Sequence, residues 1–105
     1  MMFVAHVYIP VYPNDGTLFP IETIADVRIP IVEKWGGLTV IHDAQGIAAG
    51  WPIEEVDVYE VLCDEESPTA VENWWFSYAN WARRFLSQSE LLVCVWPAVA
   101  LRATR

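Results

Sequence analysis

The segment at 67–88, SPTAVENWWFSYANWARRFLSQ, most constrains what this chain can fold into. It contains three of the six tryptophans of the chain. A step of about 100° per residue places its large apolar side chains on one stripe. The stripe comprises Val71, Trp74, Trp75, Tyr78, Ala82, Phe85 and Leu86. This pattern predicts an amphipathic helix that packs on a sheet.

The start and the end of this helix carry the expected signals. Ser67 can accept a hydrogen bond from a free backbone N–H of the first turn, and Pro68 suits the first helical position. Arg83 and Arg84 lie near the other end, where positive charge suits the helix dipole.

Two aromatic residues depart from the apolar stripe. Phe76 falls on the polar side of the helix, and Trp81 falls at the edge of the stripe. Large apolar groups at a rim can mark a contact surface, so Trp81 is a candidate interface residue. Single exposed aromatic residues are also common on soluble proteins, and this alternative stays open.

Length and composition indicate a single globular domain over residues 1–105. The hydrophobic fraction is 54% and the charged fraction is 19%, which excludes a disordered chain. The formal net charge is −8, and the six basic residues form no stripe, so direct binding of nucleic acid is not expected. A chain of this size can bury a working core without disulfides.

Acidic residues are concentrated in one short stretch. Half of the aspartates and glutamates lie at 54–66. Glu54, Glu55 and Asp57 are the candidate surface for a basic protein partner. The alternative is that this stretch is a solvated edge with no partner.

The two cysteines and the hydropathy of the chain suggest a location. Cys63 and Cys94 each lie in an expected strand and lack metal-ligand spacing, so buried free thiols are expected. The amino-terminal segment has no positive charge typical of a signal peptide, and no apolar run reaches a membrane span. We therefore expect a cytoplasmic protein that does not bind membranes.

The order of the expected elements predicts the fold. The strands are expected at 2–12, 38–42, 55–63 and 90–96, and the helices at 20–35 and 67–88. The order β-α-β-β-α-β with right-handed crossovers predicts a ferredoxin-like α+β fold. Its four-stranded antiparallel sheet would carry both helices on one face, with the first strand between the third and the fourth. Cys63 and Cys94 would then be too far apart for a disulfide.

The helix expected at 20–35 contains a proline. Pro30 removes a backbone hydrogen bond and predicts a kink or break near Ile29. The residues expected on its apolar face are Ile21, Ile24, Ala25, Val32 and Trp35. Arg28 falls on this face if the helix is straight, and a buried arginine needs a carboxylate or an anion. Alternatively, the kink turns Arg28 outward or its side chain reaches the solvent.

Three short motifs resemble a known group of proteins. They are the Gly-Gly-Leu-Thr-Val turn and strand within 35–40, the Gly-Trp pair at 50–51, and the Val-Asp-Val-Tyr-Glu-Val strand at 56–61. The chain resembles small uncharacterised bacterial and phage proteins in these motifs, over about two thirds of its length. The resemblance supports the α+β fold and implies no functional residue.

The second face of the expected sheet is the most informative surface. His6, Tyr8 and Trp96 are expected on it, together with Val4, Leu92 and Cys94, and either Tyr59 or Glu60 joins them according to the register. Such a face is too apolar to stay bare. A second copy of the chain is the favoured cover, and the segment 43–53 or the C-terminal tail is the alternative.

The sequence contains no recognisable catalytic motif. His6 and His42 are the obvious titratable candidates, but no nucleophile with a base can be identified, and no spacing indicates a metal site or a bound cofactor. The Gly46 and Gly50 spacing lacks the residues of a phosphate loop.

Three hypotheses of function follow. The leading one is a non-enzymatic binding module that acts as a homodimer through the aromatic sheet face or the acidic edge. The second is a cofactor-independent enzyme of the dimeric α+β barrel kind, in which His6, Tyr8 and Trp96 line a site for a small organic substrate and Arg28 anchors an anion. The third is an acidic inhibitor from a phage or mobile element that occupies a basic site on a host protein.

Overall fold

The computed structural model describes residues 1–11, 18–46, 54–101 and 103, and for residues 43–46, 54 and 55 it describes the backbone alone. The elements in chain order are β1 (Met2–Pro10), α1 (Ile21–Trp35), β2 (Thr39–Gly46), β3 (Glu54–Asp64), α2 (Pro68–Phe85) and β4 (Val93–Ala98). The predicted α+β class, with a four-stranded antiparallel sheet and two helices, is confirmed. The predicted turn at 14–16 and the Gly-Trp pair at 50–51 lie outside the described residues.

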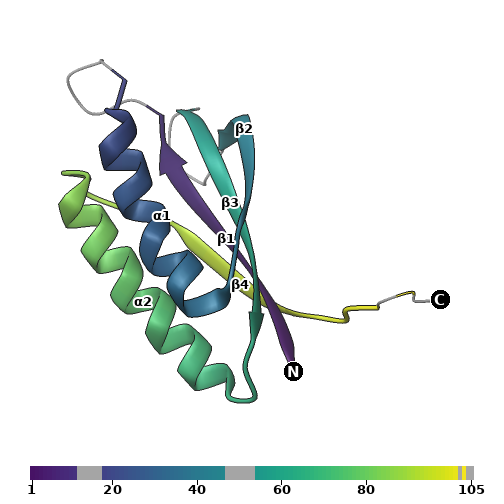
Figure 1. Ribbon diagram of the computed structural model, residues 1–105. Helices are drawn as coiled ribbons and strands as arrows, with labels where there is room; N and C mark the ends of the chain where they lie inside the picture. Colours follow the sequence, from purple (N-terminus) through teal and green to yellow (C-terminus); the bar gives the residue numbers. More distant parts are fainter. Residues whose placement is uncertain (12–17, 47–53, 102, 104–105) are drawn as a thin grey trace.

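The sheet has the strand order β2-β3-β1-β4, and every neighbouring pair is antiparallel. The first strand therefore lies between β3 and β4. Figure 1 shows α1 and α2 side by side over one face of this sheet. No described helix covers the other face, which we call the open face.

Alternation along β1 separates the two faces of the sheet. Phe3, Ala5, Val7 and Ile9 are at most 4% exposed and belong to the core under the helices. This half of the predicted alternation is confirmed. The intervening residues of β1 point to the open face, because successive side chains of a strand point to opposite sides.

The predicted apolar stripe of α2 is largely confirmed. The Ser67 hydroxyl accepts a hydrogen bond from the backbone N–H of Ala70 at 3.2 Å, which caps the first turn. The buried residues of the stripe are Val71, Trp75, Tyr78, Ala82 and Leu86. Phe85 was predicted on the stripe but is 43% exposed, and Phe76 is 73% exposed on the polar side as predicted.

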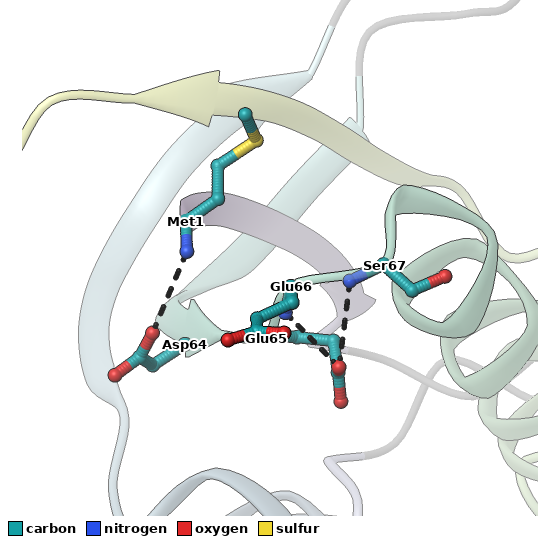
Figure 2. Close-up of polar contacts among 5 residues, drawn as sticks. All are labelled: Met1, Asp64, Glu65, Glu66 and Ser67. Atoms are coloured by element: carbon teal, nitrogen blue, oxygen red, sulfur yellow. Dashed lines mark hydrogen bonds and ion pairs between the residues drawn. The ribbon is translucent and has the colours of Figure 1, made fainter.

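A tight turn joins β3 to α2 (Figure 2). A Glu65 carboxylate oxygen accepts hydrogen bonds from the backbone N–H groups of Glu66, at 3.0 Å, and Ser67, at 3.4 Å. The backbone N–H of Glu65 donates to the carbonyl of Met1 at 3.1 Å, and the Met1 amino group lies 4.0 Å from an Asp64 carboxylate oxygen. These contacts fix the direction in which α2 leaves the sheet.

Helix α1 continues through Pro30 without a break, so of the predicted kink or break near Ile29 the break is wrong. Val27 and Ile31 are fully buried on either side of the proline and hold both halves of the helix against the sheet. The carbonyl that loses its partner belongs to Asp26, which is exposed and can bind water. The cost of the missing hydrogen bond is therefore small.

The predicted apolar face of α1 is wrong for Ile21, Ala25 and Val32, which are exposed, whereas Trp35 packs against the core as predicted. Ile21 is 84% exposed and Val32 is 45% exposed, whereas the buried residues are Val27 and Ile31. Apolar residues surround this helix on all sides, so periodicity alone does not select the buried side. Gly36 ends the helix in the left-handed conformation at φ 91°, as the Gly-Gly pair predicted.

Two strand boundaries differ from the prediction. Strand β2 extends to Gly46, four residues past its predicted end, because its backbone pairs with β3 again after an irregularity between Ile41 and Ala44. Strand β4 begins at Val93 and continues through Pro97. Proline is tolerated there because β4 lies at the edge of the sheet.

Four aromatic side chains form a cluster between the helices and the sheet: Trp35, Trp74, Trp75 and Tyr78. Neighbouring rings in it are edge-on or stacked, with centroids 4.7–6.3 Å apart. The Trp75 indole N–H donates to the Cys63 sulfur at 3.3 Å, and the Tyr78 hydroxyl donates to the Val27 carbonyl at 2.6 Å. These bonds join α2 to β3 and to α1.

Neither helix of the described chain combines the length and the hydropathy that a bilayer crossing needs.

Candidate functional site

The sheet divides the residues that the sequence singled out into two groups. His6, Tyr8 and Trp96 meet on the open face, as predicted. Arg28 lies on the helix-covered side, where it contacts Tyr59. The structure therefore does not bring Arg28 into one site with His6 within a single chain.

The first group is an open-face cluster of His6, Glu60, Tyr8 and Trp96. The register pairs His6 with Glu60 across β1 and β3, and a His6 Nε2 to Glu60 Oε2 distance of 2.8 Å joins the two side chains. Glu60, and not Tyr59, is thus the β3 residue that joins this face. The carboxylate holds the imidazole in one orientation.

Aromatic rings flank this pair on both sides. The Trp96 ring centroid lies 4.7 Å from the His6 ring at 76°, and the Tyr8 ring centroid lies 6.4 Å from it at 70°. The side chain of His6 is 22% exposed and that of Glu60 is 42% exposed. A ligand on the open face would therefore meet a carboxylate, an imidazole and aromatic rings together.

Apolar side chains extend the open face around the cluster. Leu62 is 56% exposed, Ile41 is 43% exposed and Trp96 is 40% exposed. Leu62 lies opposite Val4 in the register, on the same face as His6. The predicted apolar character of this face is present in the described residues.

The second group is a helix-side cluster of Arg28, Tyr59, Asp57 and His42. The Arg28 Nε–H donates to the Tyr59 hydroxyl at 3.0 Å, and the guanidinium carbon lies 5.1 Å from the centroid of the Tyr59 ring. His42 Nδ1 lies 3.2 Å from an Asp57 carboxylate oxygen. Asp57 and Tyr59 lie opposite Ile9 and Val7 in the register, so they share the helix-covered side of β3.

Little in the sequence pattern points to this second cluster. The side chains come from α1, β2 and β3, which are brought together only by the topology of the sheet. Arg28 was recognised as an arginine in need of an anion, but its contact with Tyr59 was not predicted. The alternation of Asp57 and Tyr59 along β3 was the one signal that could have placed them on a common face.

The remaining predicted site residues lie elsewhere. Trp81 is 36% exposed on α2 and stacks on Phe85 with ring centroids 5.2 Å apart. The side chain of Asp57 is only 18% exposed and faces His42. The side chains of Glu54 and Glu55 lie outside the described part of the structure, so the acidic partner surface stays a prediction.

The two cysteines point to opposite faces. Cys63 is buried beneath the helices, whereas Cys94 lies opposite His6 on the open face, and both are free thiols. Over the described ranges, no three His, Cys, Asp or Glu side chains gather in a way that could hold a metal ion.

Burial shifts the titration of three groups beneath the helices. Burial raises the pKa of Tyr59, while the hydrogen bond and charge of Arg28 oppose the shift and the charge of Asp57 adds to it. Burial likewise raises the pKa of Tyr78, well above its ordinary range, with a smaller contribution from Tyr59. Burial raises the pKa of the Cys63 thiol, against the hydrogen bond from Trp75.

These shifts predict a loss of stability in alkali. In the unfolded chain the thiol titrates near 9.0 and the phenols near 10.0, whereas the folded chain keeps them protonated to higher pH. Their stabilising contribution is therefore complete below about pH 9 and declines as the pH rises further. We expect the free energy of unfolding, measured in urea, to fall between about pH 9 and about pH 10.5, by on the order of 1 kcal/mol for each group.

Tyr78→Phe is the matched control for this expectation. It removes one titrating phenol and the hydrogen bond to Val27. The variant should be less stable at neutral pH, by about 1–2 kcal/mol, and should lose less stability in alkali than the parent. If the free energy of unfolding of the parent does not change between about pH 9 and about pH 10.5, the upward pKa shifts of these three groups would be contradicted.

The fold and the two clusters define a small α+β protein with polar side chains on both faces of one antiparallel sheet. No family model matches the chain, and no curated protein matches it. The resemblance to small bacterial and phage proteins therefore stays a prediction.

A solved structure with a similar fold is a phage SAM lyase in complex with S-methyl-5'-thioadenosine. The two chains are 13% identical and superpose with a TM-score of 0.68, over 90% of this chain and 80% of the other. At this identity the likeness shows the fold. It also corrects the leading hypothesis of a non-enzymatic binding module, because the similar protein is an enzyme and the alternative hypothesis of an enzyme fits it better.

Proposed function

We propose that this chain is a lyase that cleaves S-adenosylmethionine, with the open-face cluster as its reaction site. The observation that carries the proposal is the likeness in fold to a SAM lyase over 90% of the chain. The alternative hypothesis from the sequence, an enzyme without a cofactor that acts on a small organic substrate, is the same class of function. The open-face residues supply the chemistry that such a substrate calls for.

S-adenosylmethionine carries a sulfonium and a net positive charge. Aromatic ring faces attract such cations, and Trp96 and Tyr8 flank the cluster. The Glu60 carboxylate adds a negative charge beside them, and the net charge of −8 favours the approach of a cation. Both the local and the overall charge therefore suit this substrate.

Release of S-methyl-5'-thioadenosine requires cleavage of the bond between the sulfur and the carbon of the amino-acid chain. The bonding electron pair stays on the sulfur, which becomes a neutral thioether. The carbon fragment then completes its valence by loss of a proton or by attack of its own carboxylate. His6, held by Glu60, is placed to accept a proton or to orient the reacting carboxylate.

The same proposal includes the topology of the fold, the assembly of the chain and its location in the cell. The strand order β2-β3-β1-β4 and the two helices on one face support the ferredoxin-like plan. The exposed apolar residues of the open face support a homodimer, in which a second copy would exclude water from the cluster. The two free thiols support a cytoplasmic location.

The test is incubation of the purified chain with S-adenosylmethionine, followed by separation and mass spectrometry of the products. We expect S-methyl-5'-thioadenosine to accumulate with time and in proportion to protein concentration. The two routes give isomers of equal mass, an unsaturated amino acid or a lactone, so proton NMR of the second product distinguishes them. A parallel reaction in heavy-oxygen water tests for addition of water, which alone would change the mass. Light scattering on the same sample measures the mass of the assembly.

Two results together would contradict the proposed lyase activity. Complete recovery of S-adenosylmethionine, together with no binding of S-methyl-5'-thioadenosine by calorimetry, would overturn the proposed activity. A boiled sample provides the blank for spontaneous decay of the substrate.

A further inference from the structure

We propose that the helix-side cluster is a binding site for the zwitterionic end of an α-amino acid. Arg28, held in place by Tyr59, would bind the carboxylate, and Asp57 would bind the ammonium group. This site lies on the face of the sheet opposite His6, and it does not depend on the proposed lyase activity.

Arg28 is held in place but its hydrogen-bonding capacity is only partly used. Its Nε–H donates to the Tyr59 hydroxyl, and the Tyr59 ring lies beneath the guanidinium at 5.1 Å. No carboxylate of the described residues lies within ion-pair distance of Arg28. The two terminal amino groups of the guanidinium therefore remain able to bind a carboxylate in the bidentate manner that arginine favours.

Tyr59 fixes the position of that guanidinium. Its ring is fully buried between the sheet and α1, and its hydroxyl is the acceptor for Arg28. A side chain that is locked in this way loses little further freedom when a ligand binds. The pair is therefore preorganised for an anionic group.

Asp57 supplies the opposite charge at a suitable spacing. It lies two residues from Tyr59 on the same face of β3, which separates the two positions by roughly 6–7 Å along the strand. His42 contacts one oxygen of the Asp57 carboxylate and leaves the second oxygen able to accept from an ammonium group. Because the Arg28 guanidinium lies over the Tyr59 ring, a positive and a negative group occupy neighbouring positions on this face and can hold the two charges of an amino acid between them.

An isolated anion is a poorer fit than a zwitterion. The chain has a net charge of −8, and the Asp57 carboxylate lies in the same cluster. Both negative charges would repel a simple anion. The ammonium group of a zwitterion is attracted to the Asp57 carboxylate, and this attraction offsets the repulsion of its own carboxylate. The ligand class is therefore an α-amino acid, either free or as the amino-acid end of a larger molecule.

The probe is L-methionine, titrated into the intact chain by calorimetry. Two analogues each remove one charge: the methyl ester lacks the carboxylate, and N-acetyl-L-methionine lacks the ammonium group. We expect L-methionine to bind and each analogue to bind at least about ten-fold more weakly. Equal binding of all three compounds, or no binding of L-methionine, would overturn the proposal.

Three variants test whether L-methionine binds at the helix-side cluster. Arg28→Gln and Asp57→Asn should each weaken L-methionine binding by about ten-fold or more, whereas Arg84→Gln removes an exposed arginine of α2 and should leave it unchanged. Unchanged binding in both cluster variants would overturn the proposal. As a check that does not depend on the folding of a variant, the Arg28 Nε–H resonance of the parent chain should shift when L-methionine is added.

S-adenosylhomocysteine, which carries the same zwitterion on a larger molecule, distinguishes the source of the ligand. Binding that is weakened by Arg28→Gln identifies the amino-acid end of an adenosyl compound. Binding of L-methionine alone identifies a free amino acid. Either result supports a zwitterion site, and neither depends on whether S-adenosylmethionine is cleaved.

Discussion

Glu60→Gln should lower kcat/KM for S-adenosylmethionine by about a hundred-fold or more, and it should leave the fold intact. The substitution keeps the shape of the side chain but removes the negative charge that lies 2.8 Å from His6. Two contributions are lost together: the attraction of the sulfonium to the carboxylate and the orientation of the imidazole. Oriented proton-transfer groups commonly contribute a factor of about 10²–10⁴.

The measurement is a steady-state assay of S-methyl-5'-thioadenosine production over a range of substrate concentrations. Glu72→Gln is the matched control, because it removes an exposed carboxylate from α2, away from both clusters. A larger change in KM than in kcat would assign Glu60 mainly to binding of the cation. Activity of Glu60→Gln equal to that of the control would exclude the open-face cluster as the reaction site, even if the chain proves to be a lyase.

Trp75→Ala should destabilise the protein by about 3–5 kcal/mol. The side chain is 2% exposed and lies in the centre of the aromatic cluster, in contact with Trp35, Trp74 and Tyr78. Its removal leaves a cavity that the rigid neighbouring rings cannot fill, and it also deletes the hydrogen bond to Cys63. For a domain of this size such a loss is a large part of the total stability.

Urea unfolding, followed by circular dichroism, measures this loss directly. Phe76→Ala is the matched control, since it truncates the adjacent aromatic residue, which is 73% exposed. That change should alter the free energy of unfolding by no more than about 0.5 kcal/mol. Similar losses for the two variants would show that the packing around Trp75 is looser than the ring contacts indicate.

The fold class was predictable because two strong patterns agree. Strict alternation in β1 and helical spacing in α2 each specify a buried face, and the two faces fit each other. The buried face of helix α1 was harder to predict, because Ile21 and Val32 have the spacing of a buried stripe but are exposed. The continuation of β2 to Gly46 was missed because it depends on backbone pairing with β3, which side-chain patterns do not reveal.

The open-face cluster was predictable in part for the same reason. His6, Tyr8 and Trp96 follow from alternation along two strands that the topology makes neighbours. The contribution of Glu60 required the register of β3 against β1, and the sequence left that register open. The helix-side cluster could not be predicted, because the contact of Arg28 with Tyr59 depends on which side of α1 is buried.

Strand β3 supplies residues to both clusters, in alternation: Asp57 and Tyr59 on one side, and Glu60 on the other. Insertion or deletion of one residue within β3, before Asp57, that shifts the pairing register by one would place each of these side chains on the opposite face of the sheet. Changes of length in this strand should therefore be far more harmful than changes of residue type. Duplicated or shuffled versions of the gene would keep both clusters only if the number of residues in this segment changes by an even number.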